Sequence, residues 1–212
     1  MKKIILASAI VLILAGSAIA QPVSDRAVIP IGVTLVQILR IHVIDGGNIE
    51  FVFDHIQDYK TGIANSAFYT SKVVVASSTN WELHMGGDAS PMTGTDLPGN
   101  TLLLNNIGFT INFTGVNTIA ATNYAMGVPY ANSNVTANGL KLFTDAMATD
   151  GVFLNGVAGD GGDIADNAFS ILWQCGTMVA GGTNAMNAQS ILAQDPKPDR
   201  YVCNVELEIE NL

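Results

Sequence analysis

The chain has 212 residues, of which nine are Lys or Arg and eighteen are Asp or Glu, so its formal net charge is −9 at pH 7. A chain this acidic offers no basic stripe to a phosphate backbone, which disfavours nucleic-acid binding. Hydrophobic residues make up 49% of the chain, and a single domain of this length is able to bury a core of its own.

The N-terminus has the pattern of a secretory signal peptide. Two lysines precede an apolar run that ends at Leu14, and Ala18 and Ala20 give the small-x-small pattern at which signal peptidase cuts. The apolar run is too short for a membrane anchor. We therefore expect a signal peptide over residues 1–20 and one exported domain over residues 21–212, without a stable membrane span.

Export places the mature domain outside the cell or on the cell surface. Cleavage removes two of the nine basic residues and none of the eighteen acidic residues, so the mature chain is more acidic still. Charge of this sign serves solubility outside the cell or the binding of cations.

The first mature segment with a β pattern runs from Val33 to Ile44. Apolar side chains recur there at every second residue, which is typical of a half-buried strand. Val36, Ile38 and Ile44 lie on the opposite face, so we expect a partner strand, a loop or another subunit to cover that face as well. The turn at 45–48 (DGGN) then predicts a hairpin, with Ile49–Phe53 as its second strand.

Two-residue alternation predicts further strands along the chain, and Trp81 is expected in the core. These strands are Lys72–Ala76, Asn80–Met85, Ile107–Phe113, Phe169–Cys175 and Tyr201–Ile209. Gly-, Asp- and Asn-rich stretches predict long surface loops at 86–100 and 155–167. Short strands, long loops and almost no helical pattern predict an all-β fold, an antiparallel β-sandwich with Greek-key connections; a barrel is the alternative.

Cys175 and Cys203 are the two cysteines of the chain. An even count after an export signal predicts a disulfide bond between them. Each cysteine occupies a position whose side chain points to the apolar face of its predicted strand, so both thiols are expected to face one core. This alternation, which we call parity, does not set the distance between the thiols.

One acidic loop suggests an ion. Asp160, Asp163 and Asp166 stand among glycines, and calcium takes six to eight oxygen ligands from such loops. The spacing is not that of an EF-hand, and Asp and Gly in a loop also serve turns. Calcium is the only cofactor that the sequence suggests.

No pattern of catalytic residues is evident, and we expect a protein that is not an enzyme. The histidines at 42, 55 and 84 show no metal-ligand spacing, and no G-x-S-x-G motif occurs. A pair of carboxylates for glycoside hydrolysis is a spatial feature that a sequence does not exclude. Aromatic residues in the loops either stack on sugars or pack the loops down; they are Tyr59, Phe68, Tyr69, Tyr124 and Tyr130.

The signal peptide, the opening strand, the segment 77–83 (SSTNWEL) and the alternating strand Tyr201–Ile209 resemble secreted bacterial β-sandwich proteins. Their layout is similar to that of spore-coat-U-like, WxL-like and fimbrial subunit domains over most of the mature chain. The resemblance implies an immunoglobulin-like topology and a non-enzymatic role as a surface, coat or appendage component.

We therefore expect an exported structural or adhesive cell-surface protein, a subunit of an extracellular filament or coat assembled by strand addition. Because the opening strand is apolar on both faces, Val36, Ile38 and Ile44 are its expected assembly residues. The expected partners are other copies of the chain or other cell-surface proteins. The alternative is a secreted carbohydrate-binding module, calcium-dependent or not, with a glycan as its ligand.

Overall fold

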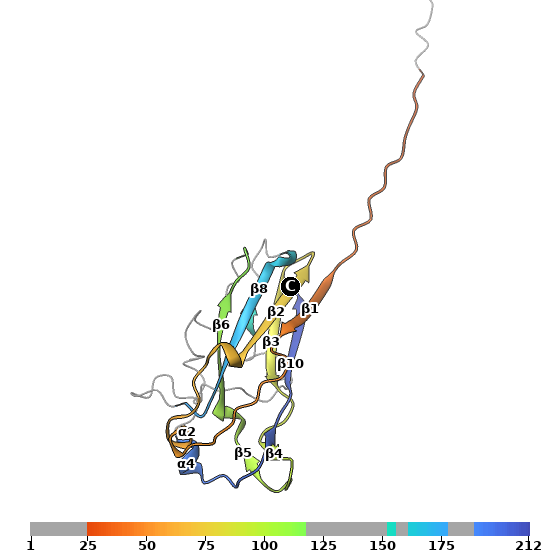
Figure 1. Ribbon diagram of the computed structural model, residues 1–212. Helices are drawn as coiled ribbons and strands as arrows, with labels where there is room; N and C mark the ends of the chain where they lie inside the picture. Colours follow the sequence, from red (N-terminus) through yellow and green to blue (C-terminus); the bar gives the residue numbers. More distant parts are fainter. Residues whose placement is uncertain (1–24, 118–151, 156–160, 178–188) are drawn as a thin grey trace, which may run out of the picture. The chain divides into compact units, whose positions relative to one another are not determined.

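The structure is a computed structural model, and it describes residues 25–117, 152–155, 161–177 and 189–212 (Figure 1). The predicted signal peptide lies outside these residues. The chain divides into two units, residues 1–35 and 36–212. The described part of the first unit, residues 25–35, contains neither helix nor strand, and every element below belongs to the second unit.

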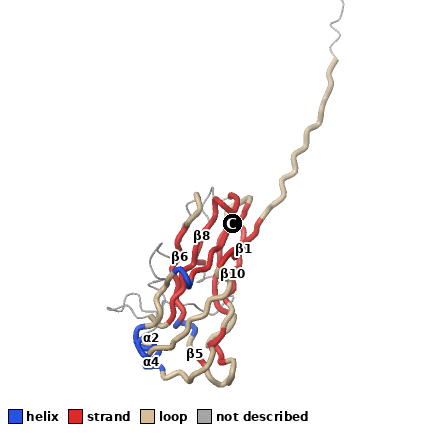
Figure 2. Tube along the Cα trace, viewed as in Figure 1, coloured by secondary structure: helices blue, strands red, loops and turns tan. Residues whose placement is uncertain are grey.

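The protein is mostly β-strand, and its strands form three antiparallel sheets (Figure 2). The four-stranded sheet has the order β1 (Leu39–Asp45), β2 (Thr70–Ser77), β8 (Gly162–Cys175), β6 (Ile107–Phe113). The three-stranded sheet has the order β10 (Val205–Asn211), β3 (Trp81–Gly87), β7 (Val152–Asn155). A small sheet joins β5 (Thr101–Leu102), β4 (Met92–Gly94) and β9 (Tyr201–Val202).

The helices in the described residues are short. Two are α-helices, α2 (Ile56–Thr61) and α4 (Ile191–Gln194), and two are 3₁₀ turns, η1 (Ala67–Tyr69) and η2 (Leu104–Asn106). None of the described helices has the length and apolar character needed to cross a membrane.

One hydrophobic core joins the two larger sheets. Its fully buried members include Val73 and Val75 of β2, Ile171 of β8, and Trp81 and Leu83 of β3. The prediction that Trp81 lies in the core is therefore confirmed. The two-residue period explains the arrangement, because alternate residues of each strand point to the same side of its sheet.

β2 is buried on both faces over three consecutive valines, Val73 to Val75. Such a continuous apolar run suits a strand in the interior of a sheet, and β2 indeed pairs with β1 on one side and β8 on the other. Next to it, the indole Nε1–H of Trp173 donates a hydrogen bond of 2.9 Å to Ser71 Oγ, which satisfies a buried donor.

The predicted hairpin is wrong, because the opening strand pairs with β2 and not with Ile49–Phe53. β1 begins at Leu39 and pairs with β2, from Leu39 opposite Ser77 to Asp45 opposite Lys72. Ile49–Phe53 is not a strand of any sheet. β2 ends at Ser77, and among the described residues before Leu39 the only backbone–backbone bond to this strand's partner is from the Ser78 N–H to the Ile38 carbonyl, so the strand starts later than the alternation in the sequence does.

The expected loops at 86–100 and 155–167 are only partly loops, because β4 lies in the first and β8 begins inside the second, at Gly162.

The last predicted strand is divided into β9 and β10 at residues 203–204. β9 pairs with β4 and β10 pairs with β3, so the two halves belong to different sheets. At the break, Asp88 Oδ1 accepts a hydrogen bond of 2.9 Å from the Asn204 backbone N–H, and its Oδ2 accepts one from the Asn204 side chain.

The core predicts a measurable contrast between buried and exposed aliphatic residues. Ile171→Ala removes a fully buried side chain at the centre of β8 and is expected to lower the free energy of unfolding by about 2–5 kcal/mol. The control Val116→Ala changes a side chain that is 83% exposed, and its effect is expected to stay within about 0.5 kcal/mol. Urea denaturation followed by tryptophan fluorescence measures both; equal effects would contradict the core assignment.

Candidate functional site

An apolar segment near the N-terminus lies exposed. Its side chains Ile29, Ile31, Val33 and Leu35 are 80–91% exposed, and they alternate with Pro30, Gly32 and Thr34. We call residues 28–35 the N-terminal segment. It has the two-residue pattern of a strand with one apolar face, but it belongs to no sheet. Large apolar side chains that stay together on a surface mark an interaction site.

Two neighbouring edge strands of the second unit, β1 and β10, each have one edge without a described partner. β1 pairs only with β2, and β10 pairs only with β3, so each has one edge without a ladder in the part of the chain that the structure describes. These two edge strands contact each other. Below them in Figure 1, both ladders stop: β1 ends at Asp45 and β10 begins at Val205.

A cavity of about 720 Å³ opens where the two ladders stop. We call it the groove. Its lining includes the segment 46–53 that follows β1, the segment 196–205 that contains β9 and the first residue of β10, and apolar core residues. The core part of the lining is contributed mainly by Met92, Leu102, Leu104, Ile107, Ile171 and Trp173.

The segment 46–53 is strand-like without being paired. Ile49, Phe51 and Phe53 are half-buried, whereas their neighbours in the sequence are exposed. No backbone–backbone hydrogen bond joins residues 47–53 to any other described residue. Backbone N–H and C=O groups in an extended, unpaired segment are free to accept another strand.

The segment 196–205 is held in place by the carboxylate of Asp199. Its oxygens accept hydrogen bonds of 2.8–3.1 Å from the backbone N–H groups of Asp96, Leu97 and Arg200 and from the side chain of Asn100. These donors, the Asp96 N–H first, lower the pKa of Asp199 to about 2. Arg200 Nε also donates to Glu50 Oε1 at 2.9 Å, which links the two segments that line the groove.

Both cysteines line the groove, but the predicted disulfide is not formed and both thiols are free. Cys175 is buried, and the burial raises its pKa to about 12. Cys203 Sγ lies 3.4 Å from Asp88 Oδ1 and 3.7 Å from the carbonyl of Ala89. Strand parity placed both thiols toward one cavity, but it did not bring the sulfur atoms together.

The structure exposes the three expected assembly residues. Val36, Ile38 and Ile44 are 75%, 51% and 63% exposed. Only Ile44 belongs to β1, and it stands at the irregularity in the β1–β2 register. The backbone of Ile38 is fixed outside the strand, because its N–H donates to Ser78 Oγ and its carbonyl accepts from the Ser78 N–H.

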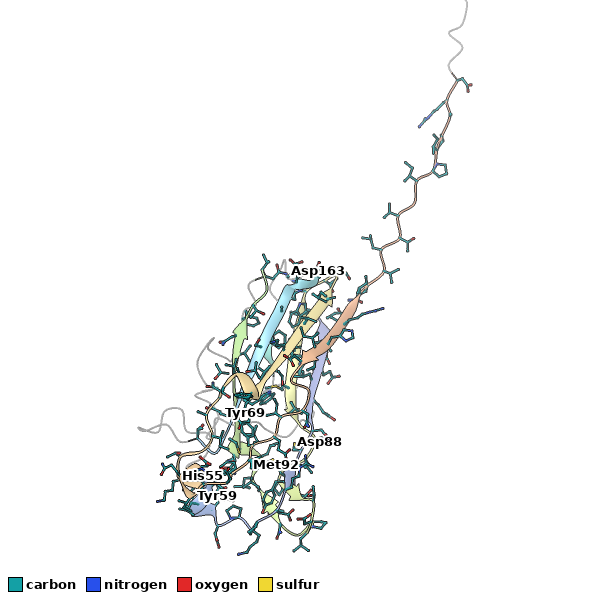
Figure 3. The ribbon with its side chains drawn as sticks, in the orientation of Figure 1. His55, Tyr59, Tyr69, Asp88, Met92 and Asp163 are labelled. Carbon is teal, nitrogen blue, oxygen red and sulfur yellow. The ribbon has the colours of Figure 1, made fainter. Side chains whose placement is uncertain are left out.

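The predicted calcium ligands are divided. Asp160 lies outside the described residues. Asp163 Oδ1 accepts hydrogen bonds from the backbone N–H groups of Ala165 and Asp166, and Asp166 Oδ2 accepts one from the Asp163 N–H. These carboxylates therefore support the start of β8. Asp163 lies at the opposite end of the sheets from Met92 and Tyr59, which line the groove (Figure 3). Calcium binding here stays a prediction.

The described loop aromatics mostly pack against other rings. Tyr69 stacks on Phe51 with ring centroids 4.5 Å apart, and Tyr59 meets Phe53 edge-on at 5.3 Å. Phe68 is 89% exposed. The other aromatics expected to bind sugar, Tyr124 and Tyr130, lie outside the described residues. Glycan binding therefore stays a prediction that rests on Phe68 among the described rings.

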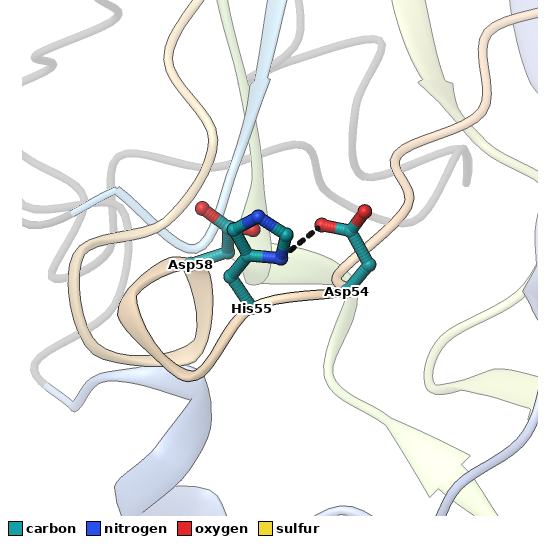
Figure 4. Close-up of side chains that lie close together, drawn as sticks. All are labelled: Asp54, His55 and Asp58. Carbon is teal, nitrogen blue, oxygen red and sulfur yellow. Dashed lines mark ion pairs between the residues drawn. The ribbon is translucent and has the colours of Figure 1, made fainter.

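A group of polar side chains gathers at the start of α2. Asp54, His55 and Asp58 place potential metal-ligand atoms within 4.8 Å of one another (Figure 4). The ion pair between His55 Nδ1 and Asp54 Oδ1 is 3.0 Å long. The pKa of His55 is raised mainly by a hydrogen bond to the backbone of Asp54 and then by the charge of the Asp54 carboxylate. His55 and Asp54 are exposed, so water and salt screen the group.

No protein-family model matches the chain, and no curated protein sequence matches it.

The groove was not predicted from the sequence. Its lining comes from segments far apart in the chain, 46–53 and 196–205, and from residues of three sheets. The alternation in Ile49–Phe53 was visible, but it was interpreted as a paired strand. The N-terminal segment has a clearer signal: the alternation from Ile29 to Leu35 is stricter than that of the residues chosen for the assembly face.

The depressed pKa of Asp199 predicts a pH-dependent contribution to stability. Because the folded pKa is below the ordinary value of 3.8, the charged carboxylate stabilises the fold above about pH 4, and this contribution is lost as pH falls toward about 2. Asp199→Asn is expected to lower Tm near pH 6, and the difference from wild type should shrink between about pH 4 and about pH 2.

Thermal unfolding followed by circular dichroism over this pH range measures the effect. The control Asp96→Asn removes a carboxylate from the loop that Asp199 contacts, but leaves the backbone N–H of residue 96 to donate to Asp199. A Tm difference for Asp199→Asn that is independent of pH, or one matched by the control, would contradict the assignment.

Proposed function

We propose that this protein is an exported structural or adhesive component of the cell surface, whose copies assemble into a filament or coat by strand addition. The N-terminal segment of one copy would add as a strand at the groove of the next. The observation that carries the proposal is the exposed, strictly alternating apolar face from Ile29 to Leu35, which belongs to no sheet. Two antiparallel sheets around one core support an immunoglobulin-like β-sandwich as the subunit fold.

The groove supplies what an added strand needs. An incoming strand requires backbone partners along its length and apolar pockets for alternate side chains. The unpaired backbone of residues 47–53 and the free edge of β10 offer the first. The apolar lining around Trp173 and Ile171 offers the second.

Burial of the apolar side chains of the N-terminal segment would contribute a substantial part of the free energy of association. Covering one aliphatic side chain contributes roughly 1.5–3 kcal/mol, so the four side chains at 29, 31, 33 and 35 contribute roughly 6–12 kcal/mol before the costs of association. Pro30 has no backbone N–H and forfeits one ladder bond. We therefore expect the ladder to run mainly through the residues after Pro30.

The test is the size distribution of the protein, expressed with its own signal sequence and collected from the cell surface and the medium. Light scattering and negative-stain microscopy are expected to show ordered polymers. The double variant Ile31→Asp/Val33→Asp places two charges on the apolar face and is expected to abolish assembly, because each buried carboxylate would need to be desolvated. Thr34→Asp, on the opposite face of the same segment, is the matched control and should assemble.

Several outcomes would remove the proposal. The first is a uniform monomer at every concentration, and the second is equal assembly by the double variant and wild type. A synthetic peptide of residues 27–37 gives an independent test, since it should compete for the groove and reduce polymer length. Polymers that change only in Val36→Asp/Ile38→Asp would move the assembly face to the residues expected first from the sequence.

A further inference from the structure

The face of the β3–β10 ladder that points away from the hydrophobic core carries a histidine among carboxylates. Glu82 and His84 are two residues apart on β3, so they point to the same side of the sheet. On β10, Glu210 stands opposite Glu82 and Glu208 stands opposite His84. The other side of this ladder is apolar and faces the core, with Leu83 opposite Ile209.

Three of these side chains converge. The possible ligand atoms of Glu82, His84 and Glu210 lie within 4.8 Å of one another, and His84 Nε2 is 3.1 Å from Glu82 Oε1. Two ligands that each lie about 2.0–2.1 Å from a tetrahedral zinc ion are separated by about 3.3 Å. The His84–Glu82 pair therefore already has nearly the spacing that a shared zinc ion requires.

The burial of this group sets it apart from an ordinary charged surface. The side chain of His84 is 5% exposed and that of Glu82 is 18% exposed. Among the described residues, no Lys or Arg makes an ion pair with Glu82 or Glu210. The described partner of Glu82 is His84, whose Nε2 lies at hydrogen-bond distance from Glu82 Oε1. The directly opposite carboxylates of Glu82 and Glu210 repel each other unless a cation lies between them.

We propose that Glu82, His84 and Glu210 form a zinc site that ties the edge strand β10 to β3. One imidazole nitrogen and two carboxylate oxygens are a ligand set that suits zinc, with water as the fourth ligand, whereas calcium prefers oxygen ligands alone. The site is distinct from the acidic loop at 160–166 and from the groove. It rests on a seven-residue ladder, from Val205 opposite Gly87 to Asn211 opposite Trp81, which holds the strands that carry the ligands.

The group Asp54, His55 and Asp58 is the natural comparison. It has the same residue classes and the same 4.8 Å limit, but its three residues come from one short stretch, and Asp54 and His55 are exposed. Its carboxylates and its imidazole are solvated without an ion. We therefore place the zinc site on the β3–β10 ladder.

Zinc binding is tested on tag-free protein in zinc-free buffer, by equilibrium dialysis with ZnCl₂ and by thermal unfolding. We expect one zinc ion per chain and a Tm that rises with zinc concentration, since a ligand bound only to the folded state stabilises it. Glu210→Gln removes one ligand at an exposed position, where folding is not at risk, and is expected to weaken zinc affinity by at least about tenfold.

Two control variants make the result specific. Glu206→Gln makes the same change on the same face of β10, but opposite Gly86, and should bind zinc like wild type. His55→Gln should also bind like wild type. Three outcomes would overturn the proposal: no saturable zinc binding, equal affinity in Glu210→Gln and wild type, or loss of binding in His55→Gln alone.

Discussion

The antiparallel ladder between β2 and β8 is the interaction on which the larger sheet depends. It runs from Thr70 opposite Leu172 to Ser77 opposite Gly162. β1 has β2 as its only described partner, and β6 has only β8, so both outer strands are placed by this pair. The same two strands supply Val73, Val75 and Ile171 to the core that the second sheet covers. A defect in this ladder would therefore disturb the edge strands and the groove together.

The parts of the fold that depend on a local period were predictable from the sequence. The strands around Trp81, Ile107 and Trp173 alternate strictly, and the structure confirms them. Pairing was less predictable, because the glycine turn at 45–48 suggested a hairpin while β2 offered a longer apolar partner. The strand break at 203–204 is where the chain changes from the small sheet to the β3 ladder and where the remote Asp88 binds Asn204, and no local pattern reveals either feature.

The candidate sites follow the same division. Alternation from Ile29 to Leu35 is a local signal for a strand, and its lack of a sheet partner emerges only from the structure. The groove and the Glu82–His84–Glu210 group need residues from distant segments, so they were not visible in the sequence. Parity placed Cys175 and Cys203 toward the same cavity, yet the bond predicted between them depends on a distance that parity does not contain.

In the proposed assembly, the N-terminal segment and the groove are different surfaces of the subunit. A contact between different surfaces is heterologous, so repeating it does not produce a two-fold symmetric dimer but a ring or an open chain. An open assembly built in this way would be polar. One end would present an empty groove and the other a free apolar segment, so growth and capping would each have a defined end at which to act.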